Sequence, residues 1–175
     1  MIDPIANQRA SGRDSIPLPT AGDARSITVG GDGLLYIVSA GDSATQTLGR
    51  LTIVDPVSRA EVGSFVGFGI LPGAVASDGG DRIFVTSVDD GLMEFNTRTR
   101  RVVRGAGSGI LLSDNVAVAV DSQGRVYAVE AGDCAPGTRG RVREFRPDLT
   151  EARNLLVGAC PTAASIVQIP APLTN

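Results

Sequence analysis

The sequence predicts an all-β protein built from repeated antiparallel units. Three observations indicate this class: short apolar runs bounded by turn residues, 22 glycines and 10 prolines among 175 residues, and no sustained 3.6-residue period. At 18.0 kDa the chain is long enough to form one domain with a substantial core. We therefore expect a single domain over residues 1–175, rich in strands and turns and with almost no helix.

An internal repeat gives the length of the unit. The segment GLLYIVSAGD at residues 33–42 recurs as GRVYAVEAGD at residues 124–133, and the match continues beyond it without a gap. A third copy lies between them at residues 78–85, with Phe84 in place of the tyrosine of the other two copies. The true unit is therefore about 45 residues, which is the length of one four-stranded β-propeller blade.

Each unit contains the pattern of four strands. In the third unit the apolar runs 116–120 and 125–129 flank a turn and predict a hairpin, and runs at 140–145 and 152–157 follow. The aromatic residue of each copy is predicted to pack between blades, at Tyr36, Phe84 and Tyr127. We expect antiparallel blades at roughly 25–67, 73–105 and 115–158, with 1–20 and 160–170 as the closing strands of a partial blade.

The two ends of the chain do not supply a complete further blade. Residues 2–10 parallel residues 54–60, where a third strand ends, and residues 163–169 match one more innermost strand. Three alternatives remain open: a four-bladed ring with a thin closing blade, a half ring completed by a second copy, or a fragment of a longer chain. Because two-fold homodimers are the commonest oligomers, we favour a homodimer that completes the propeller ring.

Two segments resemble the NHL and YVTN class of β-propeller repeats. One is LPGAVASD at 71–78 followed by RIFV at 82–85, and the other is VAVDSQGRVY at 118–127. The likeness extends over residues 20–170. This class contains interaction platforms, surface and periplasmic proteins, lactonases and lyases, so the resemblance implies an architecture and no particular activity.

The ionisable residues exclude several functions. The chain has no histidine and all its cations are arginine, so Ser-His-Asp and Cys-His nucleophiles, histidine metal sites and lysine Schiff bases cannot form within one chain. The net charge of -3 and the pI near 4.9 argue against nucleic-acid binding. No apolar stretch approaches the roughly 18 residues of a membrane span, so we expect neither a nucleic-acid partner nor a membrane span.

Two cysteines fall in loops expected on one face of the propeller, the face most often used for binding. Cys134 and Cys160 should lie over the third blade, and we expect a disulfide between them that contributes about 3 kcal/mol by restricting the unfolded chain. A disulfide would favour export to the periplasm or the cell exterior. The alternative is a pair of small buried thiols.

Carboxylates at Asp42, Glu130 and Asp133 are expected near the mouth of the channel as a ligand site. Propeller lactonases of the gluconolactonase kind are similar in holding a divalent metal there, and calcium or a similar cation on Glu130 and Asp133 would suit oxygen ligands. However, Ser39 takes the place of Glu130 in the first blade, and the second blade has a shorter loop. The set of ligands is therefore incomplete.

These observations favour a non-enzymatic binding module, without a cofactor or a catalytic residue, that presents its loop face to a protein or a small ligand. One alternative is a metal-dependent lactonase-like hydrolase that uses the channel-mouth carboxylates. Another is a truncated repeat fragment without its own activity. The exclusive use of arginine is typical of a GC-rich genome, so we expect a bacterial origin.

Overall fold

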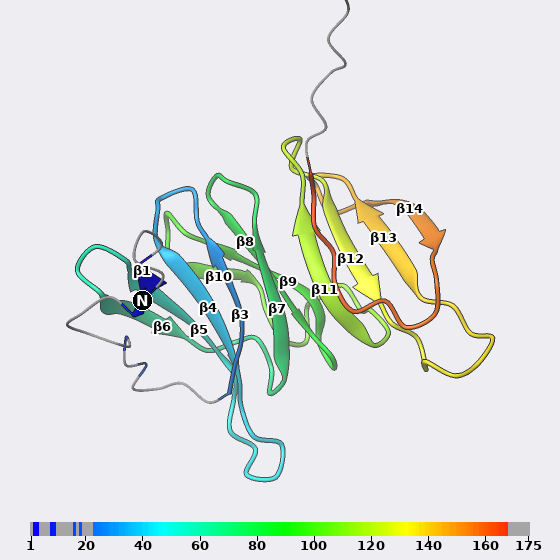
Figure 1. The fold of residues 1–175 in the computed structure, drawn as a ribbon, viewed down its shortest axis with the longest axis horizontal. Coiled ribbons are helices and arrows are strands. Elements are labelled where there is room, and N and C mark those ends of the chain that lie inside the picture. Colours follow the sequence, from blue (N-terminus) through cyan, green and yellow to red (C-terminus); the bar gives the residue numbers. More distant parts are fainter. Residues whose placement is uncertain (1, 4–7, 10–15, 17, 19–22, 168–175) are drawn as a thin grey trace, which may run out of the picture.

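The computed structural model describes residues 2–3, 8–9, 16, 18 and 23–167. This part of the chain forms three four-stranded antiparallel sheets and one two-stranded hairpin, without a helix (Figure 1). The predicted all-β class is confirmed. Within the same residues, no helix has the length and apolar character needed to cross a membrane.

Every sheet uses its strands in chain order, so each strand pairs with its neighbours in the sequence. The first sheet consists of β3 (Asp23–Val29), β4 (Leu35–Ala40), β5 (Arg50–Asp55) and β6 (Ala60–Phe65). The second consists of β7 (Pro72–Ser77), β8 (Arg82–Ser87), β9 (Gly91–Asn96) and β10 (Arg101–Arg104). The third consists of β11 (Asn115–Val120), β12 (Val126–Glu130), β13 (Arg141–Phe145) and β14 (Glu151–Leu156).

The segments expected to supply closing strands form no further four-stranded sheet in the described chain. β1 (Ile2–Asp3) and β2 (Gln8–Arg9) pair with each other, with Asp3 opposite Gln8. This pairing matches the Asp55–Ala60 pair of β5 and β6, as the likeness of the two segments predicts. Residues 161–167 have no strand assignment, and the rest of the expected strand at 163–169 lies outside the described residues.

Aspartate and glycine set the turn between the first two strands of the third sheet. The Asp121 carboxylate accepts hydrogen bonds from the backbone N–H groups of Gln123 and Arg125, both at 2.9 Å. Gly124 has a φ of 75°, in the left-handed region that glycine adopts without a steric penalty. These two features produce the hairpin that the apolar runs predict.

Two apolar cores lie between the three sheets. Successive residues of a strand point to opposite faces, and Ile83 and Val85 of β8 enter the core shared with the first sheet, while Phe84 enters the core shared with the third. All three side chains are fully buried. β8 is apolar at consecutive positions because a neighbouring sheet covers each of its faces.

The repeated aromatic residues point in one direction along the row of sheets. Tyr36 lies in the core between the first and second sheets, and Phe84 lies in the core between the second and third. Tyr127 holds the same strand position in the third sheet, but no further sheet of the described chain follows it, and its side chain is only half-buried. The prediction of a core position is therefore right for Tyr36 and Phe84 and wrong for Tyr127.

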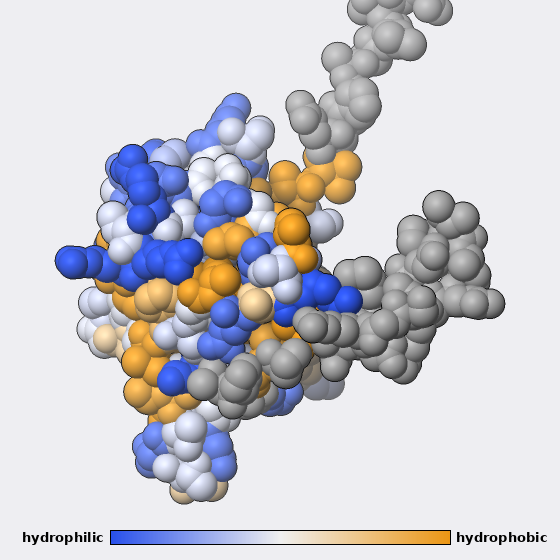
Figure 2. All heavy atoms as spheres, turned by 90° about the vertical axis from the view of Figure 1, so that its left-hand side faces the viewer, coloured by the Kyte–Doolittle hydropathy of each residue, from blue (hydrophilic) through white to orange (hydrophobic). Residues whose placement is uncertain are grey.

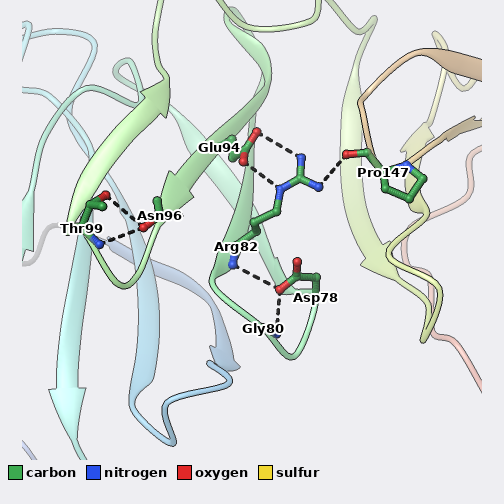
Figure 3. Close-up of polar contacts among 7 residues, drawn as sticks. All are labelled: Asp78, Gly80, Arg82, Glu94, Asn96, Thr99 and Pro147. Atoms are coloured by element: carbon green, nitrogen blue, oxygen red, sulfur yellow. Dashed lines mark hydrogen bonds and ion pairs between the residues drawn. The ribbon is translucent and has the colours of Figure 1, made fainter.

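Arg82 links the second sheet to the third (Figure 3). Its Nε and Nη2 atoms donate to the two carboxylate oxygens of Glu94 at 2.8 and 3.2 Å, and its Nη1 donates to the backbone carbonyl of Pro147 at 2.6 Å. The guanidinium also lies 4.7 Å from the centre of the Phe84 ring. One mostly buried cation thus joins two strands of its own sheet to the β13–β14 turn of the next.

Within the described residues, no further four-stranded sheet packs on the outer face of the first sheet, which is formed by Ile27, Val29, Leu35 and Ile37. Ile27 is 57% exposed, whereas Val75 and Val118, at the same position in the second and third sheets, are 6% and 7% exposed. Figure 2 shows the left-hand side of Figure 1, on which hydrophobic residues lie among hydrophilic ones. Leu18 lies near Ile27 and Ile37, beside a small apolar hollow.

Candidate functional site: a hollow at the loop end of the first sheet

Two kinds of loop meet at one end of the sheets. The Gly41 N–H donates to the Ile70 carbonyl at 2.7 Å, and the Gly140 N–H donates to the Gly158 carbonyl at 3.1 Å. Each of these bonds joins a loop between second and third strands to the connection that follows the same sheet. We call this region the loop end; it comprises residues 41–49, 66–71, 88–90, 105–114, 131–140 and 157–163.

A hollow of about 680 Å³ lies at the loop end of the first sheet. Its walls come from β3, β4, β5, the β4–β5 loop and the start of the connection to β7. This volume falls within the range of small-molecule sites. The wall includes Ala40, Leu48 and Val66 as apolar residues and Ser39 and Arg50 as polar ones.

Ser39 and Arg50 are direct cross-strand partners on β4 and β5. Ser39 is 1% exposed and its Oγ has no hydrogen-bond partner. The Nη1 of Arg50 is also buried without a hydrogen-bond partner, and no ion pair with Arg50 occurs among the described residues. A buried donor left unpaired costs about 1–3 kcal/mol, and more when it is charged. Two such groups in one hollow favour a ligand that satisfies both.

Two carboxylates also line this hollow, and each has a different partner. Asp23 forms an ion pair with Arg25 at 2.8 Å, in which both side chains are more than half exposed. Asp42 accepts a hydrogen bond from the Ala44 N–H at 2.8 Å, and this bond is the main reason that the pKa of Asp42 lies below its ordinary value. Asp42 is therefore ionised at neutral pH and adds negative charge to the rim.

The third sheet has a smaller hollow of about 240 Å³ at the equivalent place. Glu130 and Arg141 are cross-strand partners there, at the positions that Ser39 and Arg50 occupy in the first sheet. The Glu130 carboxylate is buried, accepts a hydrogen bond from the Ser113 N–H at 2.8 Å, and lies 3.6 Å from Nη1 of Arg143. The third sheet thus places its own carboxylate where the first sheet has a hydroxyl group.

The three carboxylates predicted as a ligand set do not line one common hollow. Asp42 lines the hollow of the first sheet and Glu130 that of the third. Asp133 accepts a hydrogen bond from the Ala135 N–H at 3.1 Å, which lowers the pKa of its carboxyl. Within residues 23–167 and the few others described, no group of three or more acidic or cysteine side chains is placed to hold a metal ion.

Cys134 and Cys160 are joined in a disulfide, with their Cα atoms 4.8 Å apart. The bond connects the β12–β13 loop to the segment that follows β14. Backbone hydrogen bonds between Gly140 and both Val157 and Gly158 lie beside it. The disulfide therefore fastens this final segment to the loop end of the third sheet.

Sequence reasoning missed Arg50 and Ser39 as site residues. The signal available was the repeat, which aligns Arg50 with Arg141 and Ser39 with Glu130. The Oγ of the equivalent Ser87 in the second sheet is also buried without a partner, so the feature particular to the first sheet is the unpaired Nη1 of Arg50 beside such a serine. Burial of an individual atom depends on how the loop end packs. The repeat therefore identifies the position but not its chemistry.

Comparison with known proteins gives a likeness of fold only. No protein-family model matches the chain, so the resemblance to NHL and YVTN repeats remains a prediction, and no curated protein matches it. Among solved structures, hydrazine synthase of Kuenenia stuttgartiensis is similar with a TM-score of 0.61 and 16% identity, over 88% of this chain and 42% of that one. The extracellular domain of a hybrid two-component system from B. thetaiotaomicron gives a TM-score of 0.42 and 10% identity, over 93% and 24%. The chain thus spans less than half the length of either matched chain, and it shares the fold of the matched part of the first.

Proposed function

We propose that this chain is a non-enzymatic binding module of the β-propeller type, in which the three sheets are successive blades and the loop end takes up a ligand. The observation that carries the proposal is the hollow at the loop end, where the buried polar groups of Ser39 and Arg50 lack partners. The sequence contains neither histidine nor lysine, so the Ser-His, Cys-His and Ser-Lys pairs that activate a nucleophile are missing. Binding is therefore the activity best suited to these residues.

We further propose that a second copy of the chain completes the ring. Within the chain, the face that carries Tyr36 or Phe84 always packs on the next sheet, at the face that carries Val75 or Val118. The described residues leave one unpaired face of each kind, which carry Tyr127 and Ile27. If the Tyr127 face of one copy packed on the Ile27 face of the other, the contact would repeat the packing that occurs twice within the chain. A head-to-tail contact of this kind closes into a ring when the rotation between the two copies returns to its starting point.

The disulfide supports a further part of the proposal, namely that the module works outside the reducing cytoplasm. Disulfides persist in the periplasm and in secreted proteins, where a structural bond of this kind adds stability. A mass measurement under non-reducing conditions on protein recovered from its native compartment would detect the bond. Recovery of two free thiols would contradict this part of the proposal.

Light scattering on a sizing column tests the assembly. We expect a molar mass of twice 18.0 kDa at several protein concentrations. Ile27→Arg places a charge on the outer face of the first sheet and should give a monomer, since an unpaired charge in an apolar contact is strongly unfavourable. Val57→Arg is the matched control, because Val57 lies 91% exposed in the β5–β6 turn and should leave the mass unchanged. A monomeric parent protein would refute the completed ring.

A further inference from the structure

We infer that the hollow at the loop end of the first sheet binds a small monocarboxylic acid with a short apolar chain, whose carboxylate pairs with Arg50 and Ser39. The inference rests on the proposed ligand-binding function and names the class of ligand. All residues that line the hollow come from one chain. Ser39 and Arg50 lie on the same face of the first sheet as Ile27, beside the proposed contact with the second copy.

The two unpaired donors suit a carboxylate. An arginine guanidinium presents its N–H groups as a planar fork that matches the two oxygens of a carboxylate. The Nη1 of Arg50 is buried and has no acceptor, and the Oγ of its cross-strand partner Ser39 is buried without a partner as well. One carboxylate could accept from both groups, because cross-strand partners have side chains on the same face of the sheet.

The equivalent place in the third sheet already contains a carboxylate. There Glu130, opposite Arg141, supplies a buried carboxylate that accepts a hydrogen bond from the Ser113 N–H and lies 3.6 Å from Nη1 of Arg143. In the first sheet the residue at that position is Ser39, which is too short and carries no charge. The loop end of the third sheet thus holds a carboxylate next to an arginine, and a ligand would supply the carboxylate that the first sheet lacks.

The wall of the hollow favours an apolar body for the rest of the ligand. Ala40, Leu48 and Val66 provide an apolar wall, which favours a hydrocarbon body over a polar one. Asp23 and Asp42 also line the hollow, and their negative charge disfavours a ligand with a second anionic group. A monocarboxylate fits this distribution better than a dicarboxylate, a phosphate or a sulfate.

Calorimetric titration with hexanoate tests the assignment, with hexanamide as the neutral molecule of the same shape. We expect hexanoate to bind and hexanamide to bind at least about tenfold more weakly, because a hydrogen bond to a charged group contributes more than one to a neutral group. Arg50→Met keeps the length of the side chain and should weaken hexanoate binding by about tenfold or more. Ser39→Ala, a smaller change, should weaken it by a few-fold.

Arg141→Met is the matched control, since it removes the equivalent arginine of the third sheet, which does not line the hollow of the first sheet. It should leave hexanoate binding unchanged. The inference is overturned if the parent and Arg50→Met proteins bind hexanoate equally well, or if the parent binds hexanoate and hexanamide equally well. It is also overturned if the parent binds sulfate as tightly as hexanoate. Loss of the dimer in Arg50→Met would also overturn it, because Arg50 would then pair with the second copy. A monomeric parent that binds hexanoate would refute only the ring.

Discussion

The strongest single test of the packing between sheets is the replacement of Arg82 by methionine. Methionine retains the apolar stem but removes the two hydrogen bonds to Glu94 and the one to the Pro147 carbonyl. Breaking a buried ion pair by removing one partner costs about 3–5 kcal/mol. Because the side chains of Arg82 and Glu94 are 23% and 13% exposed, water partly solvates the carboxylate left behind. We therefore expect a loss near the lower end of that range, about 3 kcal/mol.

Urea unfolding followed by circular dichroism measures this loss, and thermal unfolding should show a midpoint lower by about 6–12 °C at a slope of about 2–4 °C per kcal/mol. The double variant Arg82→Met with Glu94→Leu should recover most of the stability, since it leaves no unpaired charge. Arg98→Met is the control, because the Arg98–Asp81 pair is 3.3 Å long with side chains 78% and 49% exposed. This exposed pair should contribute less than about 1 kcal/mol. Equal losses for Arg82→Met and Arg98→Met would refute the reasoning.

Two further predictions concern the disulfide and the tyrosines. Cys134→Ser should lower the free energy of unfolding by about 3 kcal/mol, because the reduced chain loses the restriction of its unfolded state, and urea unfolding of the oxidised and reduced parent should differ by a similar amount. No difference would contradict a structural role for the bond. Burial and then a hydrogen bond to Asp32 raise the pKa of Tyr36 well above its ordinary value, and burial raises that of Tyr127. The neutral forms therefore favour the folded state below about pH 10, and stability should fall as the pH rises further. Near-ultraviolet absorbance of tyrosinate measures this, and half-ionisation of the folded protein near pH 10 would contradict it.

The sequence predicts the sheets well because their determinants are local. Apolar runs separated by Asp and Gly predict hairpins such as the one around Gly124, and the repeat predicts that three similar units follow one another. The orientation of Tyr127 toward an uncovered side could not be predicted from the same pattern. Its local sequence matches that around Tyr36, and only the presence or absence of a neighbouring sheet decides which of the two is buried.

The site shows the same division between local and non-local information. Repeat alignment places Asp42, Glu130 and Asp133 near the loop end, but it cannot tell that Asp42 and Glu130 line separate hollows. Nor does the alignment show that Arg50 lacks an acceptor. The two carboxylates that line the same hollow have other partners, because Asp23 pairs with Arg25 and Asp42 accepts from the Ala44 N–H. A hydrogen-bonding group without a partner is a property of the folded surroundings rather than of the residue type.

The order of the strands has a consequence for the history of the gene. Every four-stranded sheet is formed by one continuous stretch of chain. The same two kinds of face meet between successive sheets, because Tyr36 and Val75 share one core and Phe84 and Val118 share the other. Tandem duplication of one unit would therefore add a sheet whose two faces already fit those beside it. Such a protein can grow or shrink by whole units without redesign of its core, and the close match between residues 33–42 and 124–133 is the trace that such duplication leaves.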